Sequence, residues 1–189
     1  MYQYKGQDHL DGYADSEIAP YTAGQILAPW PNRLRDGEYT FDQLHLTLPL
    51  NEPDQHNAIH GLVRWLPWQP DSADPGQIEL SCRLPAQPGY PWTLHVSTRW
   101  SVAADGLTAT HTATNLSDTP CPCGFGAHPY VRLPGVAVDD IRLTVPARSR
   151  LEVDDRLLPT GSVPVEDTPL DYTTARPIGA LSWTPPSVT

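Results

Sequence analysis

The chain has 189 residues, of which 39% are hydrophobic and 18% are charged. This length suffices for one domain with a core, and the composition is too apolar for an intrinsically disordered chain. A net charge of −10 makes nucleic acids and anionic membranes unfavourable partners. The polar stretch 1–14 predicts no signal peptide, and the lack of a long apolar tract predicts no membrane span.

Strands are predicted wherever the 22 prolines and 13 glycines leave room for a period of two. In chain order these windows are 43–50, 78–84, 92–102 and 107–116, followed by shorter ones at 141–145 and 150–153. In the window 92–102, for example, Leu94, Val96 and Trp100 share one face. Because no internal repeat or linker is present, we interpret residues 1–189 as one all-β domain of packed antiparallel sheets.

The loop that follows Gly24 is rich in groups suited to a sugar. Pro29 and Pro31 keep Trp30, Asn32 and Arg33 out of regular structure, and binding groups often collect in such loops. An indole can cover the apolar face of a pyranose, while an amide and a guanidinium bond its hydroxyls. The structural alternative is a Trp that anchors the loop and an Arg in a surface salt bridge.

Two histidines stand beside glycines or prolines that fix their direction. His60 precedes Gly61, and His128 lies in the segment Gly126-Ala-His-Pro-Tyr130. An imidazole has an ordinary pKa near 6.5 and can act as acid or base around neutral pH, so both are acid–base candidates. Each histidine taken alone is equally compatible with a purely structural role.

Metal binding and covalent catalysis find no support in the spacing of residues. The three cysteines, Cys82, Cys121 and Cys123, lack zinc-finger spacing, and their odd number favours a reducing, cytoplasmic setting. No nucleophile elbow is present, and the glycines around Phe125 lack the Lys and Ser/Thr of a phosphate loop. The sequence therefore predicts neither a metal nor a cofactor.

Several short motifs occur together in a fixed order. They are Pro-Trp-Pro-Asn-Arg at 29–33, Asn-Ala-Ile-His-Gly at 57–61, Gly-Tyr-Pro at 89–91, Gly-Ala-His-Pro-Tyr at 126–130 and Asp-Tyr at 171–172. In this combination the chain resembles the aldose 1-epimerase (galactose mutarotase-like) family. The resemblance implies a large antiparallel β-sandwich that binds a monosaccharide and interconverts its anomers without a cofactor.

The resemblance also assigns roles to single residues. Asn32 and Arg33 correspond to a pair that contacts sugar hydroxyls, with Trp30 beside them as a further binding residue. His60 corresponds to a histidine at the ring-oxygen side of the sugar, and His128 to the general acid. Tyr130, next to His128 in sequence, is expected to shape the pocket.

The chain departs from the family at both ends, which predicts an incomplete sandwich. The family continues past the position of Thr189 to a sugar-binding Asp and a Glu that acts as general base, and no carboxylate in this sequence matches that motif. We therefore expect little or no epimerase activity from these 189 residues. A non-catalytic sugar-binding module and a hexose-6-phosphate 1-epimerase stay open as alternatives, the latter weakened because the arginines are scattered. Neither the preferred sugar nor the oligomeric state follows from the sequence.

Overall fold

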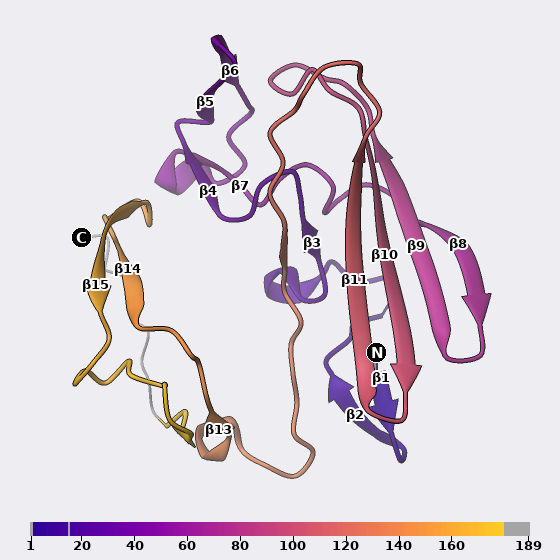
Figure 1. Ribbon diagram of the computed structural model, residues 1–189, viewed down its shortest axis with the longest axis vertical. Helices are drawn as coiled ribbons and strands as arrows, with labels where there is room; N and C mark the ends of the chain where they lie inside the picture. Colours follow the sequence, from indigo (N-terminus) through magenta and orange to yellow (C-terminus); the bar gives the residue numbers. More distant parts are fainter. Residues whose placement is uncertain (1, 15, 180–189) are drawn as a thin grey trace. The chain divides into compact units, whose positions relative to one another are not determined.

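The long windows with a period of two form the largest sheet of the computed structural model, which describes residues 2–14 and 16–179. The sheet has the order β11-β10-β9-β8, and each neighbouring pair is antiparallel (Figure 1). Its strands are β8 (Gln69–Asp74), β9 (Gln77–Leu84), β10 (Leu94–Ala103) and β11 (Gly106–Asn115). The predictions at 78–84, 92–102 and 107–116 are confirmed to within about two residues at each end. The sequence did not predict β8, which lacks alternation and carries a register shift near Pro70.

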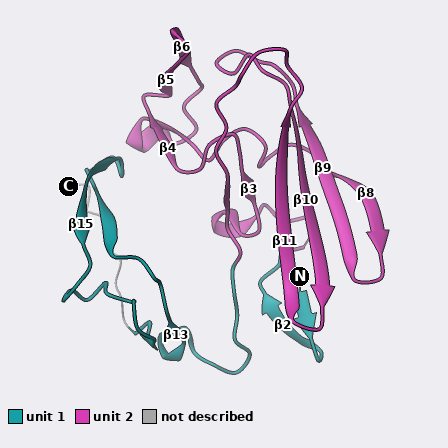
Figure 2. Cartoon of the chain, viewed as in Figure 1, with its two compact units in different colours: residues 1–12, 130–189 teal, residues 13–129 magenta. Residues whose placement is uncertain are grey.

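The chain divides into two units (Figure 2). The central unit comprises residues 13–129 and contains the large sheet. The terminal unit comprises residues 1–12 and 130–189. Each unit is described below by itself.

Short antiparallel pairs complete the central unit. β3 (Ile26–Leu27) pairs with β12 (Gly126–Ala127), and β4 (Arg33–Arg35) pairs with β7 (Asn57–Ile59). β5 (Glu38–Phe41) and β6 (Leu44–Thr47) form a hairpin, so the strand predicted at 43–50 ends before Pro49. Two 3₁₀ turns, η1 (Pro20–Thr22) and η2 (Pro53–Gln55), lie in the connections. The β3–β12 and β4–β7 pairs join segments that are far apart in sequence and so bring separate loops together.

The hydrophobic core lies in the central unit. Leu84, Leu94 and Val96 of the sheet are almost fully buried, and they share a cluster with residues from the short strands and loops. The buried members of this cluster are Ile26, Ala28, Leu48, Ala58, Val63, Cys82, Leu84, Tyr90, Trp92, Leu94 and Val96. Burial on this scale anchors the loops that carry polar residues.

The terminal unit consists of three short antiparallel strand pairs, and few of its side chains are buried. β1 (Tyr2–Tyr4) pairs with β2 (Gln7–Leu10), β13 (Arg142–Leu143) with β16 (Arg176–Pro177), and β14 (Ser149–Val153) with β15 (Pro159–Pro164). One 3₁₀ turn, η3 (Val138–Asp140), precedes β13. The strands predicted at 141–145 and 150–153 are present here. The predicted all-β, antiparallel class is confirmed, and no described helix is long and apolar enough to cross a membrane.

Candidate functional site

The pairing of β4 with β7 places His60 beside Asn32. Arg33 is in register with Ile59. Asn32 and His60, the next residues outward on the two strands, therefore lie opposite each other at the end of the ladder. The amide of His60 donates to the carbonyl of Asn32 at 2.9 Å, and the amide of Asn32 donates to Nδ1 of His60 at 3.1 Å. Nδ1 is therefore the acceptor nitrogen, which leaves Nε2 to carry the proton of the neutral ring.

The second pair of short strands places His128. Its amide donates to the carbonyl of Gln25 at 3.2 Å, and its carbonyl accepts from the amide of Gly24 at 2.8 Å, which continues the pairing of β3 with β12. The glycine that begins β12 is needed for this approach, because a Cβ on Gly126 would lie 2.8 Å from the Cβ of Pro31. The lack of a side chain at Gly126 therefore permits the close approach of the two segments.

The two predicted histidines meet. The ring centroids of His60 and His128 lie 5.2 Å apart with an interplanar angle of 79°, an edge-to-face arrangement. Nε2 of His128 is buried and has no hydrogen-bond partner among the described residues. A buried imidazole nitrogen without a partner is costly in a folded protein, so this atom is a natural contact for a ligand oxygen.

A carboxylate fixes the guanidinium of Arg33. The carboxylate of Glu52 accepts from Nε and from Nη2 of Arg33, each at 2.7 Å. It also accepts from the side-chain amide Nδ2 of Asn57 at 3.0 Å. The remaining Nη1 of Arg33 donates to Oδ1 of Asn32 at 3.1 Å. Burial alone would raise the pKa of Glu52, but the hydrogen bonds from Arg33 and Asn57 and the charge of Arg33 lower it on balance.

The surroundings of His60 keep its ring neutral. Burial lowers the pKa of His60 to about 4, aided by the charges of His128, Arg64 and Arg33 and opposed by Glu52. At neutral pH the ring is therefore an uncharged hydrogen-bonding group rather than a cation. It can orient or polarise a ligand, but it is a weak proton acceptor.

The other predicted site residues lie in different surroundings. Trp30 packs against the core cluster, and its Nε1 is buried without a partner among the described residues, so it anchors the loop and still offers a donor. Tyr130 belongs to the terminal unit, where its carbonyl accepts from the amide of Asp11, and its part in the pocket stays a prediction. Asn51 holds β7 in place through two hydrogen bonds to the backbone of Ile59.

Sequence reasoning missed three residues at this site. Glu52 orders Arg33, Gln25 holds His128 through its backbone, and Arg64 acts on His60 through its charge. No spacing rule connects these residues to their partners, because the contacts depend on strand pairs closed across long loops.

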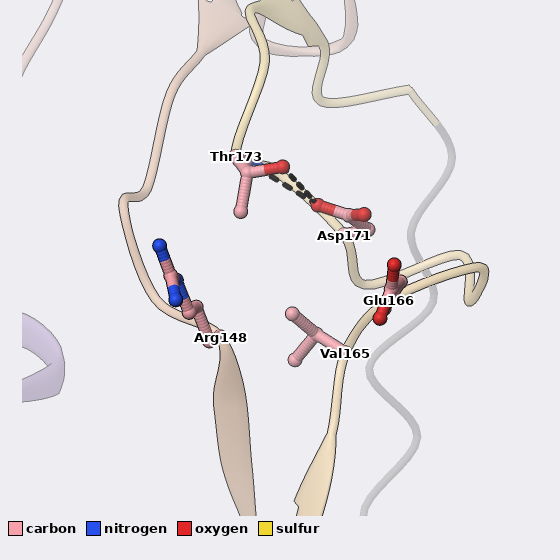
Figure 3. Close-up of a pocket in the computed structure, with 5 residues that line it drawn as sticks. All are labelled: Arg148, Val165, Glu166, Asp171 and Thr173. Carbon is pink, nitrogen blue, oxygen red and sulfur yellow. Dashed lines mark hydrogen bonds between the residues drawn. The ribbon is translucent and has the colours of Figure 1, made fainter.

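The terminal unit carries a separate pocket that the sequence did not predict. It has a volume of about 400 Å³ and is lined by Arg148, Val165, Glu166, Asp171 and Thr173 (Figure 3). The carboxylate of Asp171 already accepts from the hydroxyl and the amide of Thr173. Among the described residues, no three His, Cys, Asp or Glu side chains gather as metal ligands would. None of the predicted site residues lines this pocket.

Known proteins resemble this chain over most of its length. Residues 2–183 match the family model described as aldose 1-epimerase. The chain is 34% identical over 158 residues to the uncharacterized protein YihR of Escherichia coli, covering 83% of this chain and 51% of that protein. It is 30% identical over 174 residues to human galactose mutarotase, covering 88% of this chain and 48% of that enzyme. The chain thus spans about half the length of the curated relatives it matches.

Solved structures show the same fold. An aldose epimerase homologue from C. elegans superposes with a TM-score of 0.76 at 24% identity, covering 89% of this chain and 54% of that one. A galactose mutarotase-like protein from Clostridium acetobutylicum gives a TM-score of 0.64 at 21% identity, covering 74% and 45%. At these identities the likeness supports the architecture alone.

Proposed function

The chain belongs to the aldose 1-epimerase family, and from this premise we propose that its central unit binds a monosaccharide and takes part in interconverting the α and β anomers. Asn32 and Arg33 bind sugar hydroxyls, and His60 orients the ring oxygen. His128 is the general acid. No metal, cofactor or covalent nucleophile is needed for these roles.

One observation carries the proposal, namely the meeting of His60 with His128. Two segments far apart in sequence bring the rings to 5.2 Å, and Nε2 of His128 is left buried without a partner in the described chain. Structural histidines normally satisfy both ring nitrogens with protein groups or water. A sugar oxygen at this position would complete the hydrogen bonding of His128.

The proposed reaction is acid–base ring opening. A base removes the proton of the C1 hydroxyl while His128 donates a proton to the ring oxygen, and the bond between C1 and the ring oxygen breaks. Rotation about the bond between C1 and C2 exposes the other face of the aldehyde. Ring closure then returns the proton of the ring oxygen to His128 and the proton held by the base to the oxygen on C1, which yields the opposite anomer.

Glu52 is the carboxylate whose charge acts on His60, and it is a poor candidate for the base. Its oxygens already accept from Arg33 and Asn57, and its pKa is lowered. A well-placed acid–base group contributes about 10²–10⁴-fold. We therefore expect the 189-residue chain to bind sugar and to accelerate anomer exchange weakly.

A non-catalytic sugar-binding module is the second candidate, and the engagement of Glu52 is the observation that favours it. Such a module would use the same hydroxyl contacts from Asn32 and Arg33. It differs from the epimerase in one outcome, which is saturable sugar binding without any acceleration above buffer.

Polarimetry on freshly dissolved α-D-glucose and α-D-galactose tests the proposal, with His128→Gln as the variant. His95→Gln, which replaces an exposed histidine on β10, is the matched control. We expect a rate above buffer that disappears in His128→Gln and persists in His95→Gln. Binding without acceleration selects the second candidate, and the absence of both binding and acceleration overturns both.

A further inference from the structure

Arg64 is tied to the strand pair that places His128. Its backbone carbonyl accepts from Nε2 of Gln25 at 3.2 Å, and the backbone carbonyl of Gln25 in turn accepts from the amide of His128. The guanidinium lies close enough to His60 for its charge to lower the pKa of that ring. Arg64 therefore belongs to the neighbourhood of the histidine pair, although no motif assigned it a role.

The two arginines of this neighbourhood differ in how their charges are met. Arg33 is neutralised by Glu52 through two hydrogen bonds of 2.7 Å. Arg64 forms no ion pair within residues 2–14 and 16–179, and its Nε is buried without a hydrogen-bond partner there. The charge of Glu52 acts on Arg64 from a distance, but its oxygens are engaged by Arg33 and form no ion pair with Arg64 in the described chain.

The contacts of Arg64 within the chain do not explain this placement. Its guanidinium carbon lies 5.2 Å from the ring centroid of Trp65, but that ring is 59% exposed and a cation–π contact there is weak. A guanidinium that gives up water without a directly paired anion is unfavourable, and burial lowers the pKa of Arg64 although the charge of Glu52 opposes this shift. An anionic ligand would supply a direct ion pair.

We propose that Arg64 binds an anionic substituent of the sugar, so that the preferred substrate of this site is an acidic monosaccharide bearing a carboxylate or a phosphate. The planar fork of donors in a guanidinium matches either group in a bidentate geometry. This inference rests on the proposed function and adds the substrate class to it. Arg33 already pairs with Glu52, and its Nη1 donates to Oδ1 of Asn32, so Arg64 is the better partner for an anion.

Isothermal titration of the full chain with galactose, glucuronate and glucose 6-phosphate tests the inference, and exchange NMR on the same sugars at anomeric equilibrium reports catalysis. The acidic sugars should bind about 10–100-fold tighter than galactose, as expected for hydrogen bonds to a charged group. Arg64→Gln should abolish this preference, so that the acidic sugars bind no more tightly than galactose does. Arg83→Gln, an exposed arginine on β9, is the matched control and should keep the preference.

The two acidic sugars distinguish the sources of the charge, since a site shaped for one group should favour glucuronate or glucose 6-phosphate over the other. Raising the ionic strength should weaken binding of the acidic sugars and spare galactose, which tests the inference even if Arg64→Gln fails to fold. Equal affinity for neutral and acidic sugars, or a preference that survives in Arg64→Gln, overturns the inference. Galactose binding that depends on His128 would then leave the proposed function standing.

Discussion

The two units differ in whether their polar side chains have hydrogen-bond partners. In the pocket of the terminal unit, the carboxylate of Asp171 accepts hydrogen bonds from the amide and the hydroxyl of its neighbour Thr173. In the central unit, polar atoms of Trp30, Arg64 and His128 are buried over a hydrophobic core and lack partners among the described residues. Because buried polar atoms are almost always paired in folded proteins, the difference supports the proposal that a ligand binds the central unit.

The largest expected contrast is in core stability. Leu84→Ala in the central unit removes a fully buried side chain and should cost about 2–5 kcal/mol of unfolding free energy. Leu151→Ala in the terminal unit removes a side chain that is 62% exposed and should change stability by less than about 0.5 kcal/mol. Urea denaturation of both variants measures the contrast, and equal losses would show that the units do not differ in packing.

Glycine substitutions should show the same difference in packing between the two units, with Gly61 lying next to the site. Gly61 has a φ of +70°, and a Cβ there would collide with the backbone carbonyl of Ala28. Gly61→Ala should therefore destabilise the fold by about 2–4 kcal/mol, from backbone strain and overpacking together. Gly161→Ala on β15, with open space around its Cβ, should be neutral or slightly stabilising. Thermal unfolding of the two variants decides between these outcomes.

The ion pairs of the two units should also differ. Glu52→Gln leaves a half-buried Arg33 without its counter-charge and should cost about 1.5–3 kcal/mol. Glu152→Gln breaks an exposed pair with Arg150 and should cost less than about 1 kcal/mol. A double-mutant cycle on each pair measures the two energies. A coupling at Arg33 no larger than at Arg150 would remove the argument that Glu52 orders the site.

A pH dependence of stability also resides in the central unit. The folded state lowers the pKa of His60 to about 4, below the ordinary value of the unfolded chain, so the unfolded state binds the proton more tightly. Stability should therefore fall as the pH drops from about 6.5 toward 4, and it should show no contribution from His60 above that window. His60→Gln should flatten the curve in denaturant titrations at stepped pH, and an unchanged slope would contradict the assignment.

The sequence predicted the long strands better than the short ones. Alternation over eight or ten residues located β9, β10 and β11, because a half-buried sheet imposes that pattern. Strands of two or three residues, such as β3 and β12, are too short to show a period, and their pairing depends on the closure of a long loop.

The same distinction holds for the site. His60 and His128 were recognised from their glycine- and proline-bounded settings and from the family resemblance, but their contact follows from the β3–β12 and β4–β7 pairs. The hydrogen bonds from Arg33 to Glu52 and the missing partner of Arg64 could not be predicted, because both depend on side-chain packing across those pairs.

The most direct test of the central claim is a hexose titration followed by ¹⁵N correlation spectra of the histidine rings and of the backbone amides. A sugar that completes the central unit should shift the resonance of Nε2 of His128 in a saturable way, while the exposed His95 stays unchanged. If His128 does not respond while residues around Asp171 do, the ligand binds the terminal unit and the account of the central unit is wrong.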